Sequence, residues 1–147
     1  MNHMENAIQY HSKGYNCCQS VLAAFTGQLD ISEEVALRLG AGFGSGAGTG
    51  ELCGALTGAI MALDLILAKD HGNPIEMKKA AASRARELQQ RFSERFGALR
   101  CRELLRAEKE EPSEAVAAMG LGNHCSVMIA SAVELVEELL REQGVDL

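Results

Sequence analysis

The sequence predicts an all-α, single-domain protein: a helical bundle of about five longer helices and one or two short ones, spanning residues 1–147. Three observations predict this fold class. Apolar residues recur at helical spacing in several segments, no segment outside a glycine-rich stretch alternates with the period of a strand, and Ser or Asn precedes several of the helical segments, where either residue caps a helix. A chain of 147 residues can bury roughly two-thirds of its unfolded surface, and no repeat or linker divides it.

The central element is an apolar segment, Leu52–Ala68, that follows a glycine-rich loop. Glycine occupies every second position in Gly40–Gly50, which is too glycine-rich for a stable strand. The apolar segment is long enough for several helical turns and apolar on nearly every side, so this helix should lie at the centre of the molecule. Asp64 within it argues against a membrane span. We expect Glu51 and Cys53 in its first turn, where the helix dipole favours a carboxylate and lowers the pKa of a thiol.

Two helices are expected at the start of the chain. The first covers Glu5–Ser12. Asn16 is expected to cap the second, and Gln19 three residues later can complete a capping box. The second helix has a core stripe at helical spacing, made of Cys18, Val21, Leu22, Phe25 and Leu29. Cys17 lies at the edge of that stripe, so we expect Cys18 to pack in the core and Cys17 to be the more accessible thiol.

Two further helices are expected around the central one. One begins after Ser32 and ends at the glycines. The other follows a turn at residues 70–73, begins at Pro74 and runs to about Phe96, before Gly97. Its apolar side is expected to contain Met77, Ala81, Leu88 and Phe92. Its basic face, with Arg84, Arg86, Arg91 and Arg95, is interpreted as a solvated face with ion pairs rather than as an anion site.

The remaining segments predict one or two short helices and a long last one. A short helix should begin at Cys101, with Leu104 and Leu105 on the same apolar face. Ser113 can cap another turn or two, and Asn123 can cap the last helix. The apolar row of that last helix comprises Cys125, Ile129, Ala132, Val136, Leu139 and Leu140.

Net charge and cysteine content limit the classes of function that the sequence predicts. The net charge is −6 and there is no basic stripe, so the sequence predicts no nucleic-acid binding. The polar N-terminus has no apolar signal core, so we expect a cytoplasmic protein. Cysteines are kept reduced in that compartment, and the five cysteines therefore indicate metal binding, redox chemistry or core filling rather than a structural disulfide framework.

Four of the cysteines share one feature, a place in the first turn of a separate predicted helix: Cys17, Cys53, Cys101 and Cys125. If these helices pack around one core, their N-termini can converge, and their dipoles would favour thiolate there. An unrelated scatter of core cysteines is the alternative, since there is no CxxC or CxxCH motif. His124, beside the last of them, is a candidate proton donor or metal ligand, or simply a polar residue at a helix start.

The flanks of these cysteines resemble a known family. Cys53–Gly58 reads CGALTG and resembles the CGAxxG motif of the C_GCAxxG_C_C family of redox-active proteins. The resemblance extends over most of the chain, including Gly14–Leu22, the glycine loop, Cys101–Leu104 and the late Cys125. It implies that the four named cysteines are the site residues. It also implies redox activity and a gene context near transporters, with no firm reaction.

The leading hypothesis is therefore a cytoplasmic thiol/disulfide redox protein. Cys53 would be the attacking thiolate and one of Cys17, Cys101 or Cys125 the resolving partner, with a redox partner protein or a small thiol as the second reactant. The alternative is a metal-binding module in which the four thiolates hold Zn or an Fe–S cluster. A third hypothesis is a helical redox-sensing adaptor for a membrane transporter. The sequence leaves the disulfide pairing and the oligomeric state open, and an oligomer is compatible with it.

Overall fold

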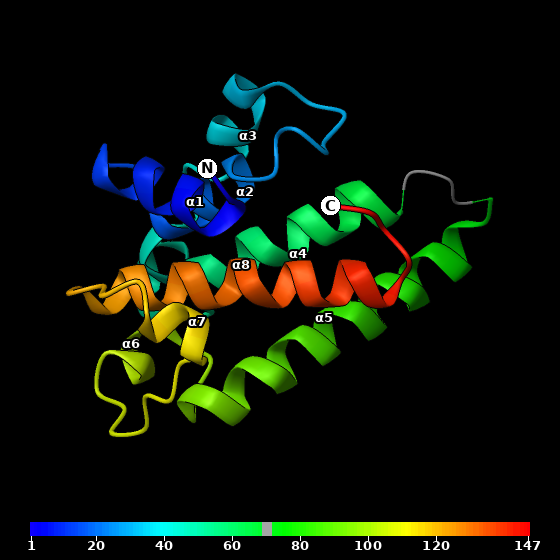
Figure 1. The fold of residues 1–147 in the computed structure, drawn as a ribbon. Coiled ribbons are helices and arrows are strands. Elements are labelled where there is room, and N and C mark those ends of the chain that lie inside the picture. Colours follow the sequence, from blue (N-terminus) through cyan, green and yellow to red (C-terminus); the bar gives the residue numbers. More distant parts are fainter. Residues whose placement is uncertain (69–71) are drawn as a thin grey trace.

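Most helices begin where the sequence supplies a capping residue. The computed structural model describes residues 1–68 and 72–147, and these contain helices but no strand (Figure 1). The helices are α1 (His3–Ser12), α2 (Cys17–Ala23), α3 (Glu33–Leu39), α4 (Gly54–Leu67), α5 (Pro74–Phe96), α6 (Cys101–Leu104), α7 (Glu114–Ala117) and α8 (His124–Glu142). The all-α prediction is confirmed. The turn expected at residues 70–73 lies largely outside the described residues.

The predicted caps form with the expected geometry. In four helices the capping side chain accepts a hydrogen bond from the backbone N–H three residues on; the caps are Asn16, Ser32, Ser113 and Asn123. Asn16 and Gln19 complete the capping box of α2. α5 starts with Pro74 and stops at Gly97, whose φ of 74° is the left-handed conformation that glycine supplies at a helix end.

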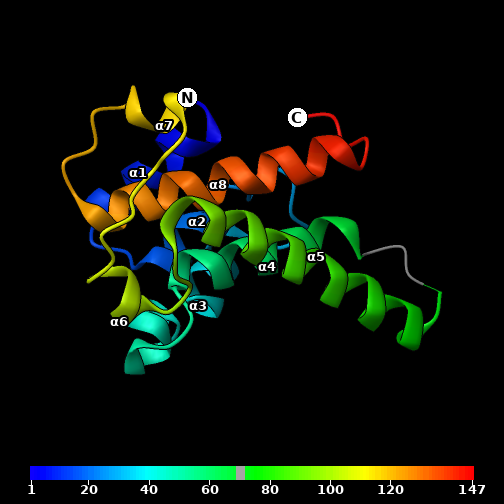
Figure 2. The same cartoon turned by 90° about the horizontal axis from the view of Figure 1, so that it is seen from below.

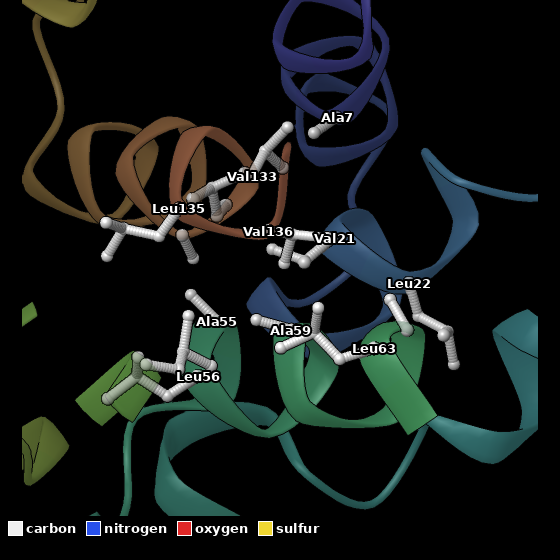
Figure 3. Close-up of a cluster of buried hydrophobic side chains, with 14 of the residues drawn as sticks. Ala7, Val21, Leu22, Ala55, Leu56, Ala59, Leu63, Val133, Leu135 and Val136 are labelled. Atoms are coloured by element: carbon white, nitrogen blue, oxygen red, sulfur yellow. The ribbon is translucent and has the colours of Figure 1, made fainter. Parts of the chain in front are cut away.

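α4 lies at the centre of the bundle, as its uniformly apolar sequence predicts. It packs against α2, α5 and α8, and α5 and α8 also pack against each other (Figure 1, Figure 2). Figure 3 shows the side chains of Ala55, Leu56, Ala59 and Leu63 on α4 pointing toward those of α2 and α8. All four are at most 1% exposed. The core is therefore aliphatic, with alanines as spacers between closely packed helices.

Two glycines of α4 set its distance from α2. A Cβ on Gly54 would lie 2.7 Å from the carbonyl oxygen of Phe43 and 3.4 Å from Cβ of Cys17. A Cβ on Gly58 would lie 2.7 Å from the carbonyl oxygen of Cys18. Because real Cβ contacts are longer than 2.7 Å, a side chain at Gly58 would force α2 away from α4, and one at Gly54 would push against both the loop at Phe43 and the start of α2. The bare backbone at Gly54 and Gly58 is what lets the start of α2 lie directly on α4.

The start of α4 differs from the sequence-based expectation. Glu51 lies outside the helix, and Cys53 is the residue that precedes its first turn rather than a member of it. Leu52 instead forms an isolated antiparallel bridge with Arg100. Glu51 makes ion pairs with Arg100 and Arg102, so its carboxylate stabilises the segments joined by this bridge rather than the dipole of α4. A bridge of one residue pair has no periodicity, so the sequence could not reveal it.

The glycine-rich loop contains a π-helical turn, η1 (Gly46–Gly50). Ser45 and Ala47 adopt positive φ angles of 53° and 58°, a conformation that favours glycine. Gly46 also has positive φ, and a Cβ there would collide with the backbone of Glu51. The tight loop is therefore confirmed, and it is folded back on itself just before the central helix.

Two residues expected in the core lie at the surface, and one helix ends earlier than expected. Met77 and Leu105 are 36% and 62% exposed, so neither contributes to the core as expected. α2 ends at Ala23, before Leu29, although Leu29 is still buried by the segment that follows. Helical spacing predicted the buried face of each helix but not where the helix leaves the core.

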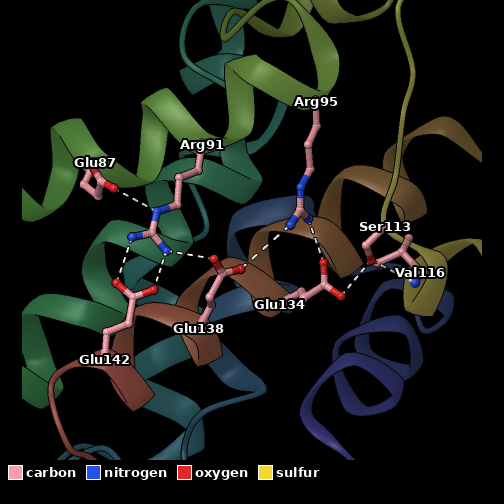
Figure 4. A network of polar contacts seen from close by, with 8 residues as sticks. All are labelled: Glu87, Arg91, Arg95, Ser113, Val116, Glu134, Glu138 and Glu142. Atoms are coloured by element: carbon pink, nitrogen blue, oxygen red, sulfur yellow. Dashed lines mark hydrogen bonds and ion pairs between the residues drawn. The ribbon is translucent and has the colours of Figure 1, made fainter.

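Ion pairs between α5 and α8 confirm the interpretation of the arginine-rich face. Arg91 contacts Glu87 on its own helix and Glu138 and Glu142 on α8, at 2.7–2.9 Å (Figure 4). Arg95 contacts Glu134 at 2.7 Å. Two further residues complete the polar layer, with Ser113 bonded to Glu134 and Arg84 paired with Asp64. Arg84 therefore joins α5 to α4, and Arg91 and Arg95 join α5 to α8.

Candidate thiol site

The four cysteines expected at helix starts meet in one cavity. Its volume is about 120 Å³, and its wall includes Cys17, Cys53, Cys101 and Cys125. They come from the first residue of α2, the residue before α4, the first residue of α6 and the second residue of α8. The N-terminal ends of α4, α6 and α8 lie toward the same end of the molecule in Figure 1. The convergence that the sequence suggested is therefore present, and all five cysteines are free thiols.

The bridge between Leu52 and Arg100 positions two of these cysteines. The backbone N–H of Cys53 donates to the carbonyl oxygen of Leu99 at 2.9 Å, and that of Cys101 donates to the carbonyl oxygen of Glu51 at 2.7 Å. Side chains alternate between the two faces along each side of such a bridge, so Cys53 and Cys101, each one residue after the bridged pair, share the face opposite to Leu52 and Arg100. The bridge thus holds the segments that contain Cys53 and Cys101 side by side at the cavity.

Cys17 and Cys125 are the two cavity thiols whose pKa values affect each other most strongly. They share a hydrogen bond, and this bond is the main reason why the pKa of Cys125 is lowered to about 6. The positive charge available on His124 and His11 lowers the pKa of Cys125 further. Both hydrogen bonding to Cys125 and burial raise the pKa of Cys17. Within the pair the proton is therefore favoured on Cys17 and the thiolate on Cys125.

Cys53 does not have the lowered pKa that its helix start predicted. Its side chain is only 5% exposed, and burial raises the pKa of the thiol to about 11. The backbone N–H groups of Ala55 and Leu56 act in the opposite direction, as expected at a helix start, but desolvation is the larger effect. The lowering of the Cys53 pKa expected from the helix start is therefore outweighed by burial, which the sequence did not reveal.

Cys101 and Cys18 occupy contrasting positions. Cys101 is half-buried at the cavity wall, and burial together with the charge of Cys125 raises its pKa. Cys18 is fully buried, does not line the cavity, and has a pKa raised by burial to about 11, with a hydrogen bond from Thr57 opposing the shift. Cys18 therefore has the packing role that helical spacing predicted.

Two histidines border the thiols. His124 lines the cavity, and its Nδ1 lies 3.9 Å from a carboxylate oxygen of Glu110. His11, on α1, bonds through Nδ1 to the carbonyl oxygen of Tyr15 at 3.1 Å. Sequence analysis identified His124 from its place beside Cys125. It missed His11, because α1 comes near the last helix only through tertiary packing.

The geometry does not supply a ready metal site. Among residues 1–68 and 72–147, no group of three or more His, Cys, Asp or Glu side chains is placed to hold a metal ion. Four thiols around one cavity have suitable chemistry for Zn or an Fe–S cluster, but their side chains are not arranged as a ligand set. The hypothesis of a Zn or Fe–S module therefore has donor chemistry in its favour and geometry against it.

Comparison with known families gives the same set of cysteines. A family model described as "Putative redox-active protein (C_GCAxxG_C_C)" matches residues 15–139. The chain belongs to this family. The matched region contains all four cavity cysteines and the Cys53–Gly58 motif. No protein with a curated description and no solved structure matches the chain.

The family motif has a structural explanation in this chain. The glycines of the CGAxxG segment are Gly54 and Gly58, the two positions where α2 touches the backbone of α4. The cysteine of the same segment lines the cavity. The motif therefore combines one thiol with the two bare positions that bring Cys17 to it.

Where the structure describes the chain, no helix is both long and apolar enough to cross a membrane.

Proposed function

We propose that this member of the C_GCAxxG_C_C family is a thiol/disulfide redox protein in which Cys125 attacks and Cys17 resolves. One observation carries the proposal. Cys17 and Cys125 line the same cavity, and hydrogen bonding between them favours the thiolate of Cys125 over that of Cys17. A thiol whose pKa lies near ambient pH is the most effective attacking group in disulfide exchange. This assignment replaces Cys53 as the nucleophile.

The reaction with a disulfide follows from this geometry. The Sγ thiolate of Cys125 attacks one sulfur of the substrate disulfide, so a mixed disulfide forms and one substrate thiolate leaves. Cys17 then attacks Sγ of Cys125, and its proton passes to one of the two departing thiolates. Two electrons move from the protein couple to the substrate, which leaves as one thiol and one thiolate, and a Cys17–Cys125 disulfide remains. The reverse sequence reduces the protein.

The dimensions of the site support a thiol partner that inserts only one group. A cavity of about 120 Å³ is smaller than the roughly 300–1,000 Å³ of ordinary small-molecule sites. A single cysteine side chain of a partner protein, or the sulfur end of a small thiol, is therefore the proposed reactant. A reducing compartment such as the cytoplasm would regenerate the dithiol.

A redox titration tests the proposal. Protein purified without oxygen is equilibrated with glutathione buffers of increasing oxidation, quenched with acid, alkylated and mapped by mass spectrometry. We expect Cys17–Cys125 to be the first disulfide to form, absent from Cys125→Ser and retained in Cys18→Ser, the buried control. A different first pair, or no reversible disulfide, would contradict the proposal.

The other two hypotheses are examined in the same preparation. Stoichiometric zinc or iron with protected thiols, measured on the anaerobic protein, would favour the metal module over the dithiol. The transporter adaptor stays a prediction, and co-purification with a membrane protein would support it.

A further inference from the structure

Two thiols of the cavity have no part in the Cys17–Cys125 couple. Cys53 and Cys101 line the same wall, and the Leu52–Arg100 bridge holds their segments together. Cys125 lines this cavity together with both of them. Cys53 is also 5% exposed, so a large external disulfide cannot reach its sulfur. A buried thiol beside a redox couple exchanges most readily with that couple.

We propose that Cys53 and Cys101 form a second dithiol, which receives the disulfide from Cys17 and Cys125 and so lets the protein hold two disulfides. This inference rests on the proposed function, because the first couple must be oxidised before it can pass the bond inward. It adds a storage step to the site and a role for the two cysteines that the first reaction does not use.

The internal transfer balances without another reactant. Cys101, the less buried of the two, attacks Sγ of Cys125, and Cys17 leaves as a thiol. Cys53 then attacks Sγ of Cys101, and Cys125 leaves. Cys125 is a good leaving group because its neighbours stabilise its thiolate. One disulfide moves, no net electrons are gained or lost, and the first couple is free to accept a second pair of oxidising equivalents.

α6 is the element that must adjust. Diagonal residues across an antiparallel bridge lie about 7–8 Å apart, and disulfides need Cα atoms within about 7 Å. α6 is only four residues long and packs chiefly on η1, so a shift of about an ångström would bring Cys101 within reach of Cys53. The buried side chain of Leu104 anchors the helix during this movement.

The test follows a single oxidising equivalent with time. Reduced protein receives one equivalent of glutathione disulfide under anaerobic conditions, and samples are acid-quenched, alkylated and mapped. We expect Cys17–Cys125 to form first and to decline as Cys53–Cys101 appears, and two equivalents to remove four thiols. In Cys53→Ser the mixed disulfide Cys101–Cys125 should accumulate, and Cys101→Ser should stop at Cys17–Cys125. Cys18→Ser should behave as the wild type.

The outcomes separate this inference from the proposed function. If Cys17–Cys125 forms and is stable while Cys53 and Cys101 stay reduced, the transfer is wrong and the proposed function stands. If Cys53–Cys101 forms at an unchanged rate in Cys125→Ser, the second pair is oxidised directly and the transfer is also wrong. If Cys17–Cys125 never forms, both proposals fail. Far-UV circular dichroism of each variant checks that the fold is retained.

Discussion

Replacing Gly58 with alanine should destabilise the protein, although alanine is the better helix former. In an unobstructed helix interior this substitution gains about 1 kcal/mol. Here the new Cβ would lie 2.7 Å from the carbonyl oxygen of Cys18, so α2 must move by about 0.7 Å to reach an ordinary contact of 3.4 Å. α2 is held by its buried stripe and by the Asn16 cap, so it cannot move freely. Overpacking against a backbone atom costs up to about 3 kcal/mol, which leaves a net loss of about 2 kcal/mol.

Urea unfolding followed by circular dichroism measures this effect. With a slope of about 1–3 kcal/mol per molar urea, a loss of about 2 kcal/mol lowers the midpoint by roughly 1 M. Gly27→Ala is the matched control, because a Cβ at Gly27 meets nothing within 4 Å and its backbone has no positive φ. A midpoint that rises or stays unchanged in Gly58→Ala would refute the close approach of α2 and α4. Wild-type thiol reactivity in a destabilised Gly58→Ala would show that this approach does not position Cys17.

Three further predictions concern polar contacts. Asn16→Ala should lower the free energy of unfolding by roughly 2 kcal/mol, because the side chain caps α2 and also donates to two loop carbonyls. Asn2→Ala, at the exposed start of α1, should lower it by less in the same urea assay. Arg91→Ala should lower the free energy of unfolding by about 1 kcal/mol, and the loss should be smaller in 1 M salt, which screens the ion pairs. Arg86→Ala, on the exposed side of α5, should change the free energy of unfolding little. A hydrogen bond with the carboxylate of Glu137 on α8 raises the pKa of His3 in the folded state. The stabilisation from this contact is therefore complete below pH 6.5 and is lost as the pH rises through the raised pKa of His3. His3→Gln should therefore cost more stability at pH 5.5 than at pH 8.5, and an equal loss at both would contradict this pH dependence.

Local features of the fold followed from the sequence, because each depends on residues a few positions apart. The caps at Asn16, Ser32 and Asn123 are interactions between neighbours in the chain, and all three form. Uniform apolarity placed α4 at the centre for a similar reason. The exposed Leu105 shows the limit, since spacing identifies a face but not what covers it.

The convergence of the four cysteines was predicted from the sequence, but the differences between their pKa values were not. Cysteines at helix starts indicated convergence, and the cavity contains all four. The raised pKa of Cys53 was not predicted because a helix dipole can be inferred from sequence, whereas desolvation of Cys53 depends on side chains from distant segments. The contact between Cys17 and Cys125 joins residues more than a hundred positions apart, and no spacing rule selects that pair from the alternatives.

The most direct test of the central claim is the pH dependence of alkylation at each cysteine. Reduced protein is treated briefly with iodoacetamide between pH 4 and pH 10, and modification is located by mass spectrometry. Cys125 should react first, with an apparent pKa near 6 that rises in Cys17→Ala and is unchanged in Cys18→Ala. If Cys53 reacts first, or if Cys125 titrates near 9 with or without Cys17, then the Cys17–Cys125 couple is not the reacting pair.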